Sequence, residues 1–228
     1  KMDKKITNQL DKIAYDYIIS KGGKPAFKGH HGFPNTICKA VNDEIVHGIP
    51  DDTPLQDGDK ITVDCGVILN GFYSDSAFSK IVGENPEAQK FIDECQQILY
   101  KALRFIKDGV RVGDLGHYIE SITKEKGYKI FKDLTGHGVG NALWEPPQIL
   151  NFGKPNTGPT LKEGMVICVE PIIGIKTGQM VTLDDDWTIA SIDGSIGCQW
   201  EHMILIKKDG CEILTKRSDE NIEVHLKN

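Results

Sequence analysis

The sequence predicts an α+β fold in which a curved antiparallel sheet is flanked by helices, and three observations support this prediction. Segments with helical periodicity and segments rich in β-branched residues both occur, and each half of the chain contains a helix followed by strands. The strands follow one another through short turns rather than long crossovers, which favours antiparallel pairing. No low-complexity linker interrupts the 228 residues, so we predict one domain that covers residues 1–228.

Three helices are predicted from apolar stripes and from residues that favour helix ends. They cover residues 3–20, 86–106 and 114–126. The stripe of the first helix consists of Ile6, Leu10, Ile13, Ala14, Tyr17 and Ile18. Asn85 is a typical N-cap residue, and Pro86 follows it at the first helical position, where its missing N–H does no harm. Gly22 and Gly127 follow directly after two of the stripes, so we expect them to end the first and third helices.

The strands are predicted from alternating or continuous runs of β-branched and aromatic residues. They cover residues 36–41, 60–69, 72–78, 165–175, 187–192, 197–207 and 211–215. Asn70-Gly71 is a typical two-residue hairpin turn, because both positions need a positive φ, and it joins the second and third of these strands. A loop rich in His, Gly and Pro covers residues 29–34.

The hairpin of residues 60–78 carries two aspartates that we expect to lie side by side. A two-residue turn pairs Gly66 with Asp75, so Asp64 and Asp75 become diagonal neighbours on one face. Such neighbours are roughly 7–8 Å apart at the backbone, close enough for both side chains to reach one metal centre. Two unpaired carboxylates inside an apolar hairpin repel each other unless cations neutralise them. The alternative is a pair of surface aspartates on a solvated hairpin face.

Three further residues have side chains that bind metals. His137 lies among glycines in Gly136-His-Gly-Val-Gly140, which lets the backbone come close; alternatively, this histidine caps a flexible loop. Glu170 and Glu201 interrupt two apolar strands, where a carboxylate is unfavourable unless it is paired or bound to metal. A buried ion pair is the alternative, but neither strand has a Lys or Arg beside its glutamate. Other acidic residues are interpreted as solvated loop charges: Glu145, Asp184, Asp185 and Asp186.

Together, the four carboxylates and the imidazole predict a centre with two divalent metal ions. Their combined charge is about −4, which two divalent cations balance. Oxygen-rich ligation with a single nitrogen favours Mn²⁺, Fe²⁺ or Co²⁺, and Zn²⁺ is also compatible. Two such cations polarise a carbonyl and stabilise a tetrahedral intermediate, which is the chemistry of a hydrolase.

The composition excludes several other classes of protein. The net charge is −6 and the charges are mixed along the chain, so we expect no nucleic-acid surface. No stretch approaches the roughly 18 apolar residues of a membrane span, and the first residues lack the apolar core of a secretion signal. The six cysteines form no Cys-x-x-Cys pair, which is typical of reduced thiols in a cytoplasmic protein.

The order of these motifs resembles that of the type I methionine aminopeptidases of metallopeptidase family M24. The likeness runs from about residue 1 to about residue 215. It is carried by Gly32-Phe-Pro34, Cys38, Val46-His-Gly-Ile-Pro50, Asp64 to Asp75, Gly136-His-Gly-Val-Gly140, Pro147-Gln-Ile-Leu150, Gly164-Met165, Glu170-Pro171 and Gln199-Trp-Glu-His202. One of these motifs alone would be a weak signal, but five ligand motifs in the right order are highly specific.

The resemblance implies a fold and an activity. It implies the pita-bread fold, whose two α+β halves are related by a pseudo-twofold axis and hold the metals between them. It also implies a cytoplasmic metalloprotease that takes part in protein maturation by removing the initiator methionine from nascent polypeptides with a small second residue. From the family we further expect a monomer with only transient ribosome proximity, and a first helix and strand that this sequence lacks.

The resemblance also assigns roles to residues. The metal ligands would be Asp64, Asp75, His137, Glu170 and Glu201. Glu170 would act as the general base as well, and His47 would hydrogen-bond the scissile amide or its tetrahedral intermediate. The methionine side chain would lie in an apolar pocket formed by Phe33, Cys38, Leu143 and Trp187, with His30 and His31 beside it.

One position departs from the family pattern. The family has a second histidine seven residues after the metal-binding one, and this sequence has Trp144 there. Loss of an oxyanion donor typically lowers the rate about 10²–10³-fold, so we expect slow turnover or a substitute donor, for which His30 is a candidate. Alternatively, Trp144 only packs at the mouth of the cleft.

Two other functions need to be separated from that of a methionine aminopeptidase. The first is a Xaa-Pro peptidase of the same fold, although such enzymes keep the later histidine and usually have an extra N-terminal domain. The second is a catalytically impaired protein that binds peptides, although all five ligands are retained here. Met-Ala and Ala-Pro peptides distinguish the first alternative, and metal analysis distinguishes the second.

Overall fold

The helices begin and end close to the predicted positions. In the computed structural model, which describes residues 6–222, α1 spans Thr7–Ser20, α2 spans Pro86–Phe105 and α3 spans Val112–Glu125. The Asn85 side chain accepts a hydrogen bond from the backbone N–H of Ala88 at 3.1 Å, which confirms it as the N-cap of α2. Gly22 and Gly127 follow α1 and α3 with φ of 78° and 82°, a conformation that favours glycine.

The predicted hairpin has the predicted register. Its strands are β4, Lys60–Leu69, and β5, Phe72–Ile81. Gly66 lies opposite Asp75, so Asp64 and Asp75 face the same side of the hairpin. Asn70 and Gly71 form the turn with φ of 52° and 86°, as a two-residue hairpin turn of this kind requires.

The strands that the structure describes pair in antiparallel fashion, in two larger and two smaller sheets. In the first larger sheet, β4 pairs with β1 (Lys24–Pro25), β2 (Ile37–Val41) and β5. The second has the order β15 (Gly210–Ile213), β14 (His202–Lys207), β9 (Val166–Val169), β7 (Gly136–Gly138) and β8 (Glu145–Ile149). The smaller sheets are β13 (Gly197–Gln199), β10 (Ile172–Gly174) and β6 (Lys129–Ile130), and β11 (Met180–Thr182), β12 (Ile189–Ser191) and β3 (Glu44–Val46). Helices with antiparallel sheets confirm the predicted α+β class.

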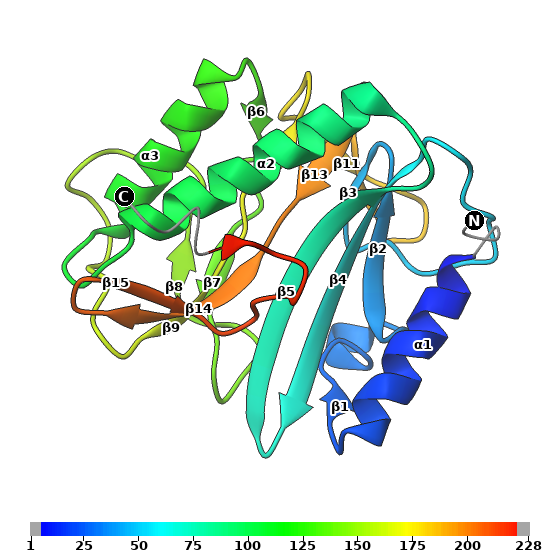
Figure 1. Cartoon of the computed structure of the whole chain (residues 1–228), viewed down its shortest axis with the longest axis horizontal. Coiled ribbons are helices and arrows are strands. Elements are labelled where there is room, and N and C mark those ends of the chain that lie inside the picture. The colour runs from blue at the N-terminus through cyan, green and yellow to red at the C-terminus, as the bar shows by residue number, and fades with distance from the viewer. Residues whose placement is uncertain (1–5, 223–228) are drawn as a thin grey trace.

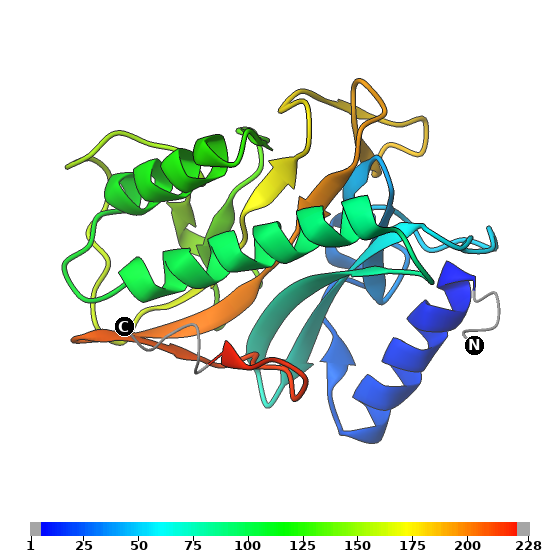
Figure 2. The same cartoon turned by 45° about the horizontal axis from the view of Figure 1, so that its top comes forward.

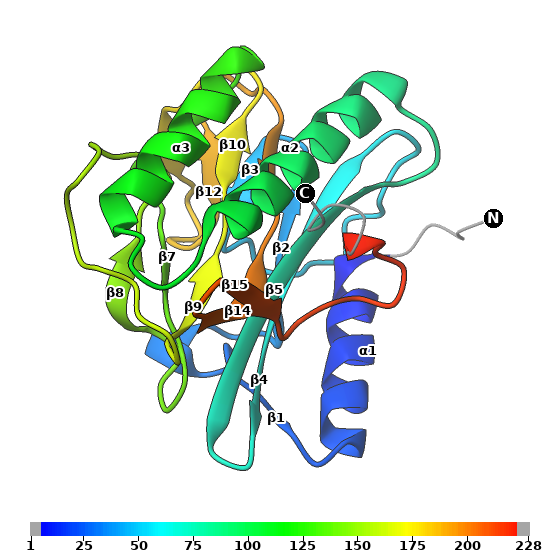
Figure 3. The ribbon, with the colours of Figure 1, turned by 60° about the vertical axis from the view of Figure 1, so that its left-hand side comes forward.

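The helices α2 and α3 pack together against the sheets, whereas α1 lies away from them, beside β1 and β2 (Figure 1). Figure 2 shows α2 crossing in front of the sheets, and Figure 3 shows α2 and α3 on the same side of the molecule. Apolar side chains of α2, together with Ile106 just after its end, are buried in the largest core: Phe91, Ile92, Cys95, Ile98, Leu99, Ala102, Leu103 and Ile106. This core includes residues of β9 and β14, so it supports the strands beside the predicted glutamate ligands.

Two predicted strands are each divided by a glutamate. The predicted strand 165–175 is β9 and β10, interrupted at Glu170-Pro171, and the predicted strand 197–207 is β13 and β14, interrupted at Trp200-Glu201. Pro171 has no N–H to donate, and the N–H of Glu201 donates to the carbonyl of Ala77 in β5 at 3.0 Å. The chain therefore passes from one sheet to another at each glutamate, which corrects the prediction of two continuous strands.

The first predicted helix is present, but its apolar stripe is only partly covered. Of its predicted apolar stripe, only Ile18 is fully buried, whereas Ile13 is 55% and Tyr17 is 63% exposed. The described part of α1 contacts the sheet through β1 and β2, so only one edge of the helix is covered. Residues 3–5 of the predicted helix lie outside the described residues.

Two predictions from composition can be compared with the structure. All six cysteines are free thiols, as predicted. Within residues 6–222, no helix combines the length and the apolar character that crossing a membrane requires.

Candidate metal centre

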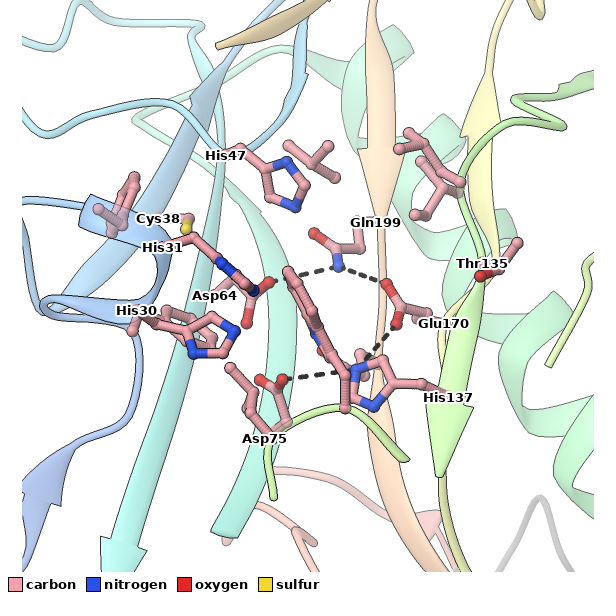
Figure 4. Close-up of a pocket in the computed structure, with 18 of the residues that line it drawn as sticks. His30, His31, Cys38, His47, Asp64, Asp75, Thr135, His137, Glu170 and Gln199 are labelled. Atoms are coloured by element: carbon pink, nitrogen blue, oxygen red, sulfur yellow. Dashed lines mark hydrogen bonds and ion pairs between the residues drawn. The ribbon is translucent and has the colours of Figure 1, made fainter. Parts of the chain in front are cut away.

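A cavity of about 540 Å³ lies beside the hairpin, and every residue assigned to the site from the sequence lines it. These residues are His30, His31, Phe33, Cys38, His47, Asp64, Asp75, His137, Leu143, Trp144, Glu170, Trp187 and Glu201. Figure 4 shows that the two aspartates and His137 and Glu170 project into the cavity from opposite sides. Tertiary structure therefore brings together side chains that are more than 100 positions apart in the sequence.

The two aspartates of the hairpin are not on a solvated face, since Asp75 is buried and Asp64 is half-buried. Asp75 is only 4% exposed, and its carboxyl group shares a hydrogen bond with that of Asp64. One oxygen of each, Oδ1, is buried without a hydrogen-bond partner among the described residues. This burial contradicts the alternative of two surface aspartates on a wet hairpin face.

His137 presents one ring nitrogen to the carboxylates and uses the other for a backbone hydrogen bond. Its Nε2 lies 3.7 Å from Oδ2 of Asp75 and 3.7 Å from Oε1 of Glu170, while Nδ1 lies 2.9 Å from the carbonyl oxygen of Gly138. With Nδ1–H donating to that carbonyl, Nε2 has its lone pair free for a metal. Burial lowers the pKa of His137, which favours the neutral, metal-binding form.

The glycines beside His137 allow β7 to pass between two neighbouring strands. A Cβ at Gly136 would lie 2.3 Å from the carbonyl oxygen of Cys168 in β9, and one at Gly138 would lie 2.4 Å from that of Pro146 in β8. Side chains at these positions would push β7 away from its neighbours and shift the imidazole. The glycines are thus required by packing, which contradicts the alternative of a histidine on a flexible loop.

Neither glutamate forms an ion pair with a Lys or Arg within residues 6–222. Glu201 is 1% exposed, and its Oε1 is buried without a hydrogen-bond partner. The amide of Gln199 donates to Oε2 of Glu170 at 3.1 Å and to Oδ2 of Asp64 at 3.5 Å. Since no Lys or Arg in this part of the chain forms an ion pair with either glutamate, the alternative of a buried ion pair does not hold.

Burial raises the pKa of all four carboxyl groups, and repulsion by neighbouring carboxylates adds to this shift in three of them. Burial raises the pKa of Asp64 to about 7, even though hydrogen bonds with Asp75 and Gln199 oppose the shift. Burial, followed by the charges of neighbouring carboxylates, holds the pKa values of Asp75, Glu170 and Glu201 well above their usual range. Divalent cations would reverse this local field and favour the ionised forms.

The donor set fits a pair of divalent cations. Three buried carboxylate oxygens lack partners among the described residues, namely Oδ1 of Asp64, Oδ1 of Asp75 and Oε1 of Glu201. A buried oxygen without a hydrogen bond is unfavourable, and a cation is the partner that an ionised carboxylate at this place would bind. Oxygen donors with one imidazole nitrogen are the ligands expected for hard or borderline divalent metals.

The predicted apolar pocket is a single packed cluster in the same cavity. Phe33, Cys38 and Leu143 are buried together, and Trp187 packs against them with its ring edge-on to Phe33 at 5.1 Å between centroids. The backbone N–H of Trp187 donates to Oδ1 of Asp185 at 2.9 Å. Asp185 therefore stabilises the turn that presents the tryptophan, whereas the sequence suggested only a solvated loop charge.

His47 follows β3 in a left-handed conformation. Its φ is 61°, and a Cβ at the following Gly48 would lie 2.3 Å from the carbonyl oxygen of Lys39, so strand β2 passes very close to this turn. Figure 4 shows the imidazole on the side of the cavity near Asp64 and Gln199. Burial lowers the pKa of His47, which keeps the ring neutral and able to donate a hydrogen bond near pH 7.

Trp144 forms a group of rings with the two adjacent histidines. Its indole stacks on His31 with 5.6 Å between centroids and meets the ring of His30 edge-on at 4.8 Å. The indole is 52% exposed, so it lies at the mouth of the cavity. Nε2 of His30 is buried without a partner among the described residues, although the ring lines the cavity.

Two residues close to the ligands were not identified from the sequence. Gln199 joins Glu170 and Asp64 through its amide, and Cys168 lies beside Glu201. Each residue precedes a predicted glutamate ligand by two positions, and alternate residues of a strand share a face. Periodicity could have identified both, but neither residue type by itself indicates a metal site.

Known proteins resemble this chain along most of its length. The profile of metallopeptidase family M24 matches residues 2–208. A methionine aminopeptidase of Mycoplasma capricolum is 43% identical over 209 residues, which are 91% of this chain and 83% of that protein. Methionine aminopeptidase 1 of Bacillus subtilis is 40% identical and covers 92% of this chain, with 85% of its own length matched.

Solved structures show the same architecture. The methionine aminopeptidase of Thermotoga maritima superimposes with a TM-score of 0.92 at 37% identity and covers 94% of this chain and 87% of its own. That of Rickettsia prowazekii gives a TM-score of 0.91 at 36% identity, with coverage of 93% and 87%. A prolidase of Pyrococcus furiosus gives 0.73 at 24% identity over 58% of its own chain, which shows a common fold only. These likenesses confirm the predicted pita-bread fold.

Proposed function

This chain belongs to metallopeptidase family M24, and we propose that it removes the N-terminal methionine from polypeptides with a small second residue. The observation that carries the proposal is the composition of one cavity, which joins five buried or half-buried metal-binding side chains to an apolar cluster. The metal ligands in this proposal are Asp64, Asp75, His137, Glu170 and Glu201. Four carboxylates and one imidazole bind two divalent cations without net charge.

The apolar cluster suits the side chain of methionine. Phe33, Cys38, Leu143 and Trp187 offer a polarisable wall of two aromatic rings and a thiol, against which a flexible thioether packs well. The cluster contains no charged side chain, so the methionine side chain displaces water from no charged group when it enters. The α-amino group of the substrate then lies toward the metal end of the cavity.

The chemistry is amide hydrolysis with Glu170 as the proton carrier. The two cations, when bound, supply Lewis-acid activation of the scissile carbonyl and of the attacking water. Glu170 takes the proton from the attacking water and returns it to the leaving amine. His47, neutral at pH 7, donates a hydrogen bond to the scissile amide or to the tetrahedral intermediate, and His30 and His31 contact the substrate at the mouth of the cavity.

The test uses purified protein freed of metal and then loaded with Mn²⁺, Fe²⁺, Co²⁺ or Zn²⁺. We expect free methionine to be released from a Met-Ala-Ser peptide, and no release of alanine from an Ala-Pro peptide. Metal analysis is expected to give up to two ions per chain. Cleavage of only the Ala-Pro peptide would instead support a Xaa-Pro peptidase, and an intact fold that binds no metal would support a peptide-binding protein.

Trp144→His is expected to raise kcat for methionine release, by up to about 10²-fold, because it adds an imidazole donor at the mouth of the cavity. The side chain is half exposed, so the smaller ring is accommodated without disturbing a packed core. Initial rates at saturating peptide measure the effect, and Trp144→Phe is the control that keeps an aromatic ring without a donor. An unchanged rate in Trp144→His would indicate that His30 already provides the donor, and His30→Ala would then lower kcat.

The proposal also covers the compartment, the oligomeric state and the ribosome proximity of the enzyme. We take the protein to act in the cytoplasm as a monomer, on nascent chains close to the ribosome. Size-exclusion chromatography with light scattering tests the monomer, and release of methionine from ribosome-bound chains tests the setting.

A further inference from the structure

The thiol of Cys168 lies beside three of the proposed metal ligands and has no role in the proposed reaction. Cys168 is fully buried in the middle of β9, where it lies directly opposite His137 of β7. Directly opposite residues of an antiparallel pair point to the same face of the sheet. The thiol and the imidazole therefore project to the same side, toward the carboxylates.

Four ligand atoms meet at this point from four different segments of the chain. The sulfur of Cys168, a ring nitrogen of His137 and carboxylate oxygens of Asp75 and Glu201 all lie within 4.8 Å of one another. A cation with bonds of about 2.0–2.3 Å to four donors holds them roughly 3–4 Å apart, so the observed group needs only small side-chain movements. The buried, unpartnered oxygens of Asp75 and Glu201 independently point to a cation here.

We propose that Cys168 is a sulfur ligand for the cation bound by Asp75, His137 and Glu201, and that it gives this centre a preference for thiophilic metals. The inference rests on the proposed function, since it concerns the same centre. As the sulfur–metal bond forms, the S–H bond breaks, the electron pair stays on sulfur, and the proton leaves to the solvent. Thiolate ligands favour Zn²⁺ and Cd²⁺ over Mn²⁺, which prefers oxygen.

Cobalt spectroscopy tests the sulfur–metal bond without any measurement of activity. Metal-free wild type, Cys168→Ser and Cys38→Ser are each titrated with Co²⁺, and a thiolate-to-cobalt charge-transfer band is recorded in the near ultraviolet. Cys38 is the matched control, because it lines the cavity that holds the proposed ligands but is not among the four clustered donors. We expect the band in the wild type and in Cys38→Ser, and its loss in Cys168→Ser.

Metal affinities provide the second measurement. Cys168→Ser is expected to bind Cd²⁺ at least about tenfold more weakly than the wild type, while its Mn²⁺ affinity changes less than about twofold. Circular dichroism checks the fold of each variant, and Cys168→Ala gives the same comparison if the serine variant does not fold. A wild-type spectrum without the band, or a band that persists in Cys168→Ser, overturns the inference.

Methionine release by the Mn²⁺-loaded wild type separates this inference from the proposed function. Release of methionine without a cobalt band would mean that the sulfur ligand is wrong and the peptidase is right. A cobalt band without release under any metal would mean that the sulfur ligand is right and the peptidase is wrong.

Discussion

Replacing Glu170 by glutamine is expected to lower kcat for methionine release by about 10³-fold or more. The carboxylate of Glu170 lies 3.7 Å from Nε2 of His137 and accepts a hydrogen bond from the amide of Gln199 at 3.1 Å, which fixes it at the edge of the metal centre. Glutamine has nearly the same shape, but its amide cannot take up a proton near pH 7. The variant thus loses the proton carrier and a charged ligand at once. Initial rates with a Met-Ala-Ser peptide measure the effect, together with the metal content of the variant.

Glu145→Gln is the matched control for this experiment. Glu145 lines the same cavity, and its carboxylate accepts the backbone N–H of Ala142 at 2.8 Å, an interaction that the oxygen of glutamine retains. We expect its kcat to stay within about twofold of the wild type, since this glutamate is not among the proposed ligands. Equal losses in both variants, or an active Glu170→Gln enzyme, would contradict the role of Glu170.

The metal-free protein is expected to become less stable as the pH rises from about 4 to about 8. The folded state raises the pKa of Asp64 from 3.8 to about 7 because the group is buried, and the other three carboxyl groups shift in the same direction. A group whose pKa is raised by folding stabilises the protein fully below its unfolded pKa, and this contribution is lost as the pH passes the folded value. For Asp64 alone, the shift corresponds to about 4 kcal/mol.

Divalent cations are expected to reverse this trend. Ionised carboxylates bind metal more tightly, so the stabilisation by Mn²⁺ should increase over the same pH range and reach about 2.7 kcal/mol when its concentration is 100 times Kd. Urea unfolding at pH 4.5, 6 and 8, with chelator or with Mn²⁺, measures both effects. In Asp64→Asn, one titrating ligand is absent, and we expect a flatter pH dependence and weaker stabilisation by Mn²⁺. Equal stability with and without Mn²⁺ at pH 8 would contradict the metal centre.

Local patterns correctly predicted those parts of the fold that depend on neighbouring residues. The hairpin register follows from one two-residue turn, which places Asp64 and Asp75 on the same face, and the helix start at Asn85 follows from its cap and the proline after it. The class of the fold and the set of ligand candidates were predictable for the same reason. A carboxylate within an apolar strand and a histidine between glycines both depart from the residue types that the local structure favours. Such departures are typical of functional sites.

Contacts between distant segments decided the rest. Glu170 and Glu201 lie at breaks where the chain changes sheets, because Pro171 cannot donate to a ladder and the N–H of Glu201 bonds to Ala77 of another strand. The exposure of the apolar stripe of α1 depends on which strands pack against that helix. The apolar periodicity of the helix does not determine which strands these are.

The sequence by itself therefore determined which side chains can bind metal, since chemical type and local register are written in consecutive residues. Only the tertiary structure decided that Gln199 and His30 line the same cavity as these side chains and that Cys168 lies beside Glu201. The physical reason is that burial and proximity depend on how the sheets and their connecting segments pack together. A glutamine, a cysteine or a histidine has the same local pattern whether it lies in a core or beside a metal.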